Sequence, residues 1–155
     1  MIDIPPPSKP VPDWVVQAQK RDQLANGALP SNKAAVFDAL VAAGITDVIV
    51  HFDGYGDSGQ IEGIEAQAAD RTIELPESLI AFVRPLGDGS GIETLALPIR
   101  DVLETLVYGF LEETHGGWEN NEGAYGDFTF DVAKRSITLE YNERFVESER
   151  FEHSF

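Results

Sequence analysis

The sequence predicts an α+β fold in which an antiparallel sheet of about four strands is covered on one face by two or three helices. Two observations indicate this class. Apolar residues recur at helical spacing in two separate parts of the chain, and each part is followed by two segments in which apolar and polar residues alternate, as in strands. The resulting order of helix, two strands, helix and two strands is typical of an α+β sandwich, because a helix buries its apolar stripe against the apolar face of a sheet.

The N-terminal part predicts an arm followed by helix. Residues 1–12 hold five prolines, so they can form neither a helix nor an interior strand, and we expect an extended arm. The segment from Asp13 to about Gly27 permits a helix. Ser31 is a suitable N-cap for the next helix and Gly44 is placed to end it. The apolar face of that helix is predicted to contain Val36, Phe37, Leu40 and Val41.

A change to a period of two marks residues 45–53 as the first strand, with Val48, Val50 and Phe52 on its buried side. Glycines punctuate the turn that follows, and Ile61 to about Gln67 is predicted to pair back on this strand. We expect a further short strand around 71–75. Residues 76–96 fit a buried helical turn or a strand equally well, and the glycine-rich stretch 87–91 within them is predicted to be a loop.

The clearest helix begins after Pro98 and ends at Gly116 and Gly117. Its apolar stripe consists of Ile99, Val102, Leu103, Leu106, Phe110 and Leu111. After a loop at 118–126, the alternating segments 128–132 and 137–141 predict a closing hairpin. We therefore expect a single acidic domain at 13–146 and a loosely held acidic tail at 147–155.

The composition restricts the classes of function. The chain has 155 residues, of which 27 are Asp or Glu and 11 are Lys or Arg, a net charge of −16. Such a chain repels the phosphates of nucleic acids and anionic membranes, so direct binding to either is disfavoured. The charge is also uneven. Residues 1–33 carry four basic and three acidic residues, whereas residues 34–155 carry the other seven basic and 24 acidic residues, a net of −17.

Two features that the sequence lacks restrict the classes of protein further. With no cysteine, the chain has no disulfide, thiolate metal site or cysteine nucleophile. No stretch approaches the roughly 18 apolar residues that a membrane span needs, and prolines 5–7 stand where a signal peptide would have an apolar run. We therefore expect a cytoplasmic protein.

Two motifs, FDGYGDSGQIEGI at 52–64 and LEETHGGWENNEGAYGDFTFDVAKRSITLEYNER at 111–144, are distinctive. Together they resemble an uncharacterised domain family from bacterial genomes and plasmids, whose members carry similar loops before a closing hairpin. The resemblance covers residues 34–146. It implies a shared architecture and an association with mobile elements, and it implies no activity.

The same motifs contain candidate metal ligands. Glu112 and His115 are three residues apart, a spacing that presents a carboxylate and an imidazole on one helix face. Together with the carboxylates of the first motif they form the candidate set Asp53, Asp57, Glu62, Glu112 and His115. If the two loops lie at one end of the sheet, this set could hold Mg²⁺ or Mn²⁺ and make the protein a metal-dependent hydrolase of a phosphate ester.

Each of these features also has a structural explanation. The glycines of the first motif suit a tight hairpin in which Asp57 and Ser58 cap backbone amides. The spacing is not that of an EF-hand, because Tyr55 stands at the third position of the loop and Ser58 at the sixth. His115 in the last turn of a helix interacts favourably with the helix dipole without any metal.

The function that the sequence favours is a non-catalytic interaction or regulatory protein that needs no cofactor. Ordered carboxylates can occupy the basic groove of a nucleic-acid-binding protein in the manner of a nucleic-acid mimic, and exposed aromatic residues can anchor such an interface. The candidate partner-binding residues are Trp118, Glu119, Tyr125, Glu140, Glu143, Glu147 and Glu149. The alternatives are the metal-dependent hydrolase and an accessory subunit whose acidity serves only solubility.

Overall fold

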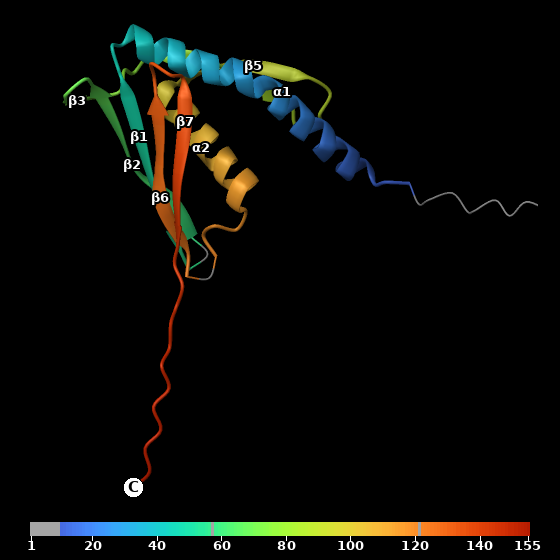
Figure 1. The fold of residues 1–155 in the computed structure, drawn as a ribbon. Coiled ribbons are helices and arrows are strands. Elements are labelled where there is room, and N and C mark those ends of the chain that lie inside the picture. Colours follow the sequence, from blue (N-terminus) through green and yellow to red (C-terminus); the bar gives the residue numbers. More distant parts are fainter. Residues whose placement is uncertain (1–9, 57, 121) are drawn as a thin grey trace, which may run out of the picture.

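The computed structural model describes residues 10–56, 58–120 and 122–155, which form two helices and seven strands (Figure 1). All the strand pairs are antiparallel. One sheet has five strands in the order β3-β2-β1-β6-β7, and the other is a hairpin of β4 and β5. The predicted α+β class is confirmed. The elements are α1 (Asp13–Ala42), β1 (Asp47–Tyr55), β2 (Ser58–Ala68), β3 (Arg71–Ile73), β4 (Leu79–Pro85), β5 (Ile92–Pro98), α2 (Ile99–His115), β6 (Ala124–Asp131) and β7 (Ser136–Glu143).

Strand β1 is the centre of the five-stranded sheet, between β2 and β6. Its predicted inward side chains, Val48, Val50 and Phe52, are all buried. They form the core together with Phe128 and Phe130 of β6. The predicted pairing of the second strand back onto the first is confirmed, and so is the closing hairpin. A bulge interrupts the pairing of β1 with β2 between His51 and Phe52.

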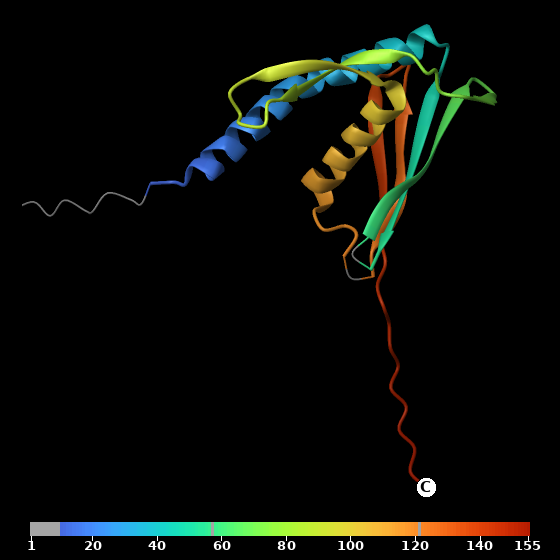
Figure 2. The same cartoon turned by 180° about the vertical axis from the view of Figure 1, so that it is seen from behind.

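Helix α2 lies against the inward face of this sheet (Figure 2). Its predicted stripe is confirmed, since Ile99, Val102, Leu103 and Leu111 are fully buried. Phe110 is partly buried, and its ring lies 6.1 Å from that of Phe128. Among the described residues, no helix covers the opposite face of the sheet (Figures 1 and 2).

Helix α1 differs from the prediction, because a single helix replaces the two that Gly27, Pro30 and Ser31 appeared to separate. Ser31 is therefore not an N-cap. Pro30 removes one hydrogen bond of the helix, but tertiary contacts hold the helix on both sides of it. The Arg21 guanidinium donates to the Gly87 carbonyl and the Asn32 amide binds Val83. In addition, α1 crosses one end of the sheet instead of covering its face, so α2 alone has that role (Figure 1).

Residues 76–96, for which the sequence left two alternatives open, contain β4 and the start of β5. The outer edge of β4 faces α1. There the buried Asn32 side chain donates to the Val83 carbonyl and accepts from the Val83 N–H, both at 2.8 Å. The side-chain amide thus makes the two hydrogen bonds that a neighbouring strand would make. Helix α1 closes an edge of the hairpin in this way.

Both ends of the described chain leave the body. Residues 145–155 extend from β7 with every side chain exposed (Figure 1), including Phe145, Phe151 and Phe155. At the other end, the first turns of α1 project past the hairpin. Of the predicted proline arm, residues 10–12 are described and exposed, and residues 1–9 lie outside the described residues. None of the described helices combines the length and the apolar character that crossing a membrane requires.

Candidate functional site

The two sequence motifs meet in the structure through Trp118. This residue follows α2, and its side chain is buried against the hairpin of β1 and β2. The indole ring meets the Phe52 ring edge-on at 5.5 Å. Gly54 and Gly59, which are paired across the two strands, lie beneath the ring. A Cβ at Gly54 would lie 2.6 Å from the indole, and one at Gly59 would overlap it, so only glycine leaves room for Trp118 at these positions.

The loop that carries Trp118 is also fitted closely to this hairpin. Gly123 has a φ of +80° and sits against the backbone of Gly54, so that any Cβ would overlap the Gly54 carbonyl. Backbone hydrogen bonds close the loop, with the N–H of Asn120 donating to Gly117 and that of Gly123 donating to Asn120. The Arg144 N–H donates in turn to Gly123. The glycines of both motifs thus have a packing role. Asp57, which was predicted to cap this turn, lies outside the described residues.

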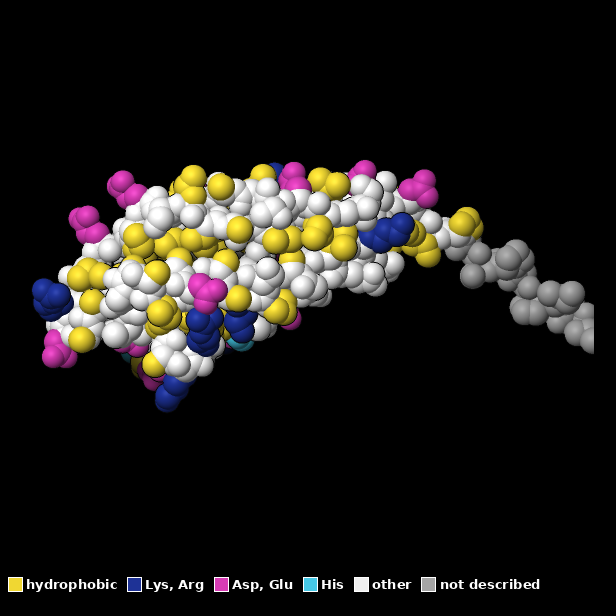
Figure 3. Space-filling model, turned by 90° about the horizontal axis from the view of Figure 1, so that it is seen from above, with side chains coloured by type: hydrophobic (Ala, Val, Ile, Leu, Met, Phe, Trp, Pro, Cys, Tyr) yellow, Lys and Arg dark blue, Asp and Glu magenta, His cyan; other side chains and the backbone are white. Residues whose placement is uncertain are grey.

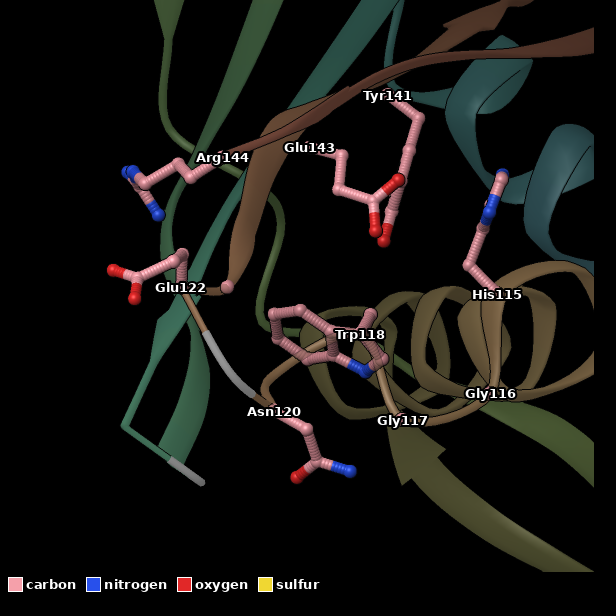
Figure 4. Close-up of a pocket in the computed structure, with 10 residues that line it drawn as sticks. His115, Gly116, Gly117, Trp118, Asn120, Glu122, Tyr141, Glu143 and Arg144 are labelled. Atoms are coloured by element: carbon pink, nitrogen blue, oxygen red, sulfur yellow. The ribbon is translucent and has the colours of Figure 1, made fainter. Parts of the chain in front are cut away.

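A small pocket of about 160 Å³ opens beside Trp118, between the end of α2 and β7 (Figure 4). The His115 ring stacks on the Tyr141 ring at 3.6 Å, with an angle of 4° between the planes. Glu143 lies next to Tyr141 in the same pocket (Figure 4). Burial raises the pKa of the Tyr141 hydroxyl, and the negative charges of Glu143 and Glu119 raise it further. The pocket therefore favours a neutral phenol.

This environment predicts that Tyr141 loses its proton at a higher pH than an ordinary tyrosine. Because the pKa of Tyr141 is raised on folding, the folded protein keeps a proton that the unfolded chain loses near pH 10. The stability that this proton provides is present below about pH 10 and is lost as the pH rises through the folded pKa. When the folded protein is titrated with base, we expect the tyrosinate absorbance to include one component that rises only at a higher pH. This component should disappear in Tyr141→Phe and move to lower pH in Glu143→Gln, and an unchanged curve in both variants would contradict the assignment.

Of the candidate metal ligands, Asp57 lies outside the described residues, and the four that the structure describes do not come together. In β1, the inward direction of Val50 and Phe52 turns His51 and Asp53 to the opposite side of the sheet, here called the outer face. Asp53 and Glu62 lie on this outer face, whereas His115 stacks on Tyr141 on the inner side. Glu112 lines a groove beside α1. Within residues 10–56, 58–120 and 122–155, no group of three or more His, Asp or Glu side chains could hold a metal ion.

The carboxylate of Asp53 has a cationic partner. The Arg144 guanidinium lies 2.8 Å from the Asp53 carboxylate and 4.7 Å from the centre of the Tyr125 ring. It also donates to the Gly54 carbonyl at 3.2 Å. The hydrogen bond to Asp53 raises the pKa of Arg144, so the guanidinium is charged throughout the physiological range. The arginine ties the end of β7 to the hairpin of the first motif.

The outer face is the most acidic surface that the sheet presents. Strand register places seven carboxylates on it or at its bulge: Asp47, Asp53, Glu62, Glu65, Asp127, Asp131 and Glu140. His51 stands among them, hydrogen-bonded through Nδ1 to Asp127 and with Nε2 3.7 Å from Glu65. A shallow depression of about 410 Å³ lies here, with Tyr125 and Glu140 in its lining. This face combines exposed negative charge with the hydrogen-bonded backbone of four neighbouring strands.

The predicted partner-binding residues are distributed over several places. Trp118 is 5% exposed, so the prediction that it anchors a partner is corrected, because its indole fills the space above two glycines. Tyr125 and Glu140 lie on the outer face, and Glu143 lines the small pocket. Glu119 is partly buried. Glu147 and Glu149 belong to the exposed C-terminal segment.

His51, Glu65 and Asp127 are among the outer-face residues that the candidate sets omitted. For two of these residues, the sequence contained a pattern that indicates their position on the outer face. His51 and Asp127 occupy positions that alternate with buried apolar residues in their strands, and such positions must face away from the core. Glu65 follows a bulge that shifts the alternation of β2, so its side could not be read from the pattern alone.

Comparison with known proteins places this fold in a family. A family model described as a family of unknown function (DUF6878) matches residues 28–155. The matched region thus includes both motifs and the exposed C-terminal segment, and it begins within α1. No curated protein matches the chain, and no solved structure does.

Proposed function

Because this chain belongs to the DUF6878 family, whose function is unknown, we propose its function from the surface itself: it is a non-catalytic interaction protein whose outer face binds a basic surface of a protein partner. The best candidate for that partner is a protein that binds nucleic acid through the same basic surface. The resemblance to proteins of mobile elements makes an inhibitor or regulator of such an enzyme a suitable role.

The observation that carries this proposal is the array of carboxylates on the outer face. Neighbouring strands lie about 4.8 Å apart, and residues on one side of a strand repeat about every 7 Å. Asp127 and Glu140 are paired on the neighbouring strands β6 and β7, and Glu65 lies on β2, on the other side of β1, so the sheet holds these carboxylates at fixed positions across the outer face. A basic groove that accepts regularly spaced phosphates offers complementary charges to such an array.

The net charge of −16 supports the same function through the kinetics of association. An acidic protein approaches a basic surface faster than a neutral one, and salt reduces this advantage. The Debye length falls from about 30 Å at 0.01 M salt to about 10 Å at 0.1 M. We expect binding to the partner to weaken steeply over this range.

The test is affinity capture from an extract of cells that carry the gene, with elution by salt. One variant, Glu62→Gln/Glu65→Gln/Glu140→Gln, neutralises three exposed carboxylates of the outer face. A matched control, Glu77→Gln/Glu122→Gln/Glu152→Gln, removes the same charge from exposed positions elsewhere. The captured protein is then mixed with labelled duplex DNA to measure whether the acidic protein displaces the DNA.

We expect the wild type and the control variant to capture a DNA-binding protein and to displace the duplex, and the outer-face variant to lose both properties. Equal weakening by the two variants would show that only total charge matters, which is the expectation for an accessory subunit. Full capture by the outer-face variant would contradict the proposal.

A further inference from the structure

A groove of about 800 Å³ lies between α1 and α2, with the hairpin of β4 and β5 beside it. It is on the side of the sheet that α2 covers, away from the outer face. Its apolar lining consists of Leu29, Phe82, Val83, Pro85, Leu97, Leu106 and Phe110. This volume is within the range of known binding sites, and apolar side chains dominate the lining.

A glycine within α2 leaves open space beside this groove. Gly109 stands in the interior of the helix and lines the groove. A glycine at such a position destabilises a helix relative to alanine. A Cβ at Gly109 would meet nothing within 4 Å, so the packing of this chain does not require the glycine. The free space above it allows the backbone or a large side chain of an occupant to approach α2.

The edges of the groove select the charge of the occupant. Asp22 lies on α1, and Glu112 and Glu113 lie in the last turn of α2, where the helix dipole is also negative. The nearby Arg84 is paired with Glu93 at 2.6 Å. The groove therefore favours an apolar segment with basic flanks.

The chain itself contains such a segment in the first turns of α1. Trp14 is 70% exposed and Val11 is 55% exposed, although both are large apolar residues. Lys20 follows them, whereas the Arg21 guanidinium is bound to the Gly87 carbonyl of its own chain, and the N-terminal part of the chain is the part without a net negative charge. Figure 3 shows hydrophobic side chains together with Lys and Arg side chains at the end of the molecule where α1 begins.

We propose that the groove of one copy binds residues 11–20 of a second copy, which are Val11, Pro12 and the first turns of α1. The same molecule cannot fill its own groove in this way. Helix α1 is continuous from Asp13 to Ala42, and its middle part, near Asp22 and Leu29, forms one wall of the groove. Its own first turns are therefore directed past the groove. When each of two copies inserts this segment into the groove of the other, the exposed apolar segment and the apolar groove are both covered. This inference is independent of the proposed function of the outer face.

The test is the molar mass of the full chain in solution, measured by light scattering or sedimentation at micromolar concentrations. We expect the wild type to form a dimer. Trp14→Ser removes the main apolar contact of the segment, and Gly109→Leu places a branched side chain in the groove, with a Cβ that meets no atom of its own chain within 4 Å. Each variant is expected to be a monomer. Val41→Ser, which changes an exposed valine in the last turn of α1, is the control that keeps the dimer.

Mixing the two monomeric variants gives the sharpest result. The Trp14→Ser chain has an intact groove and the Gly109→Leu chain has an intact helix segment, so we expect the mixture to recover a dimer with one of its two contacts. Thermal unfolding of Gly109→Leu at or above the wild-type temperature shows that its fold is intact. A monomeric wild type, or a mixture that stays monomeric beside a dimeric wild type, would overturn the proposal and leave the groove to a basic helix of another protein.

Discussion

Replacing Trp118 by alanine is expected to destabilise the protein by about 3–5 kcal/mol, the usual cost of removing a buried aromatic side chain from a core. The indole contacts Phe52 and covers both Gly54 and Gly59, and without it the loop after α2 loses its main attachment to the sheet. Denaturant unfolding followed by circular dichroism measures the change. A cost below about 1 kcal/mol, which is typical of surface positions, would contradict the packing role.

A pair of substitutions tests the contact itself. Gly59→Ala places a Cβ where the indole lies, and we expect it to be strongly destabilising in the wild type. In the Trp118→Ala background the same substitution meets no indole, so its cost is expected to become small. Gly63→Ala, in the same strand with nothing within 4 Å of the new Cβ, is the control. Equal costs of Gly59→Ala in both backgrounds would show that the two residues are not coupled.

Asn32→Ala is the second substitution with a large expected effect. It removes both hydrogen bonds to Val83 and leaves a peptide N–H and a carbonyl of β4 without partners. Each such group costs about 1–3 kcal/mol when it is kept from water, so we expect a loss of about 2–4 kcal/mol. Hydrogen exchange at the Val83 amide is expected to become faster, because α1 no longer closes this edge of the hairpin.

Two comparisons make this prediction specific. Asn32→Asp keeps an acceptor for the Val83 N–H but turns a carboxylate oxygen toward the Val83 carbonyl, where the two oxygens repel each other, so its cost is expected to be at least that of Asn32→Ala at neutral pH. Asn26→Ala changes an exposed asparagine on the same helix and is expected to be nearly neutral. An Asn32→Ala protein as stable as Asn26→Ala would show that α1 and β4 are held together by other contacts.

The sequence predicted the elements whose pattern is local. Strand β1 and helix α2 each bury one face against the core, so their periods of two and 3.6 residues were visible, and both are confirmed. Helix α1 was divided wrongly at Pro30, because the contacts that carry the helix through this position come from residues 83 and 87, far along the chain. The hairpin of β4 and β5 was not resolved for the same reason, since its edge is completed by a helix.

The candidate site could be predicted only in part. The sequence showed that the two motifs belong together, but it did not show why. The physical reason is the packing of Trp118 on Gly54 and Gly59, and these residues are about 60 positions apart in the chain. The metal-site prediction assumed that carboxylates near one end of the sheet share a side. Alternation along β1 places Asp53 on the outer face, and the stacking on Tyr141 holds His115 on the inner side.

The acidic outer face also has a consequence for how the chain folds. Strand β1 forms its first pair with β2 across a short turn, but its other neighbour, β6, lies far along the chain, as the 76 positions between His51 and Asp127 show. Pairs of such high separation form late, so one edge of β1 is open while β6 is still unplaced. Asp47 and Asp53 put negative charges along that open edge, and like charges oppose pairing between the edges of two nascent chains. Asp47 and Asp53, two carboxylates of the outer face, are thus expected to oppose aggregation before the sheet is complete.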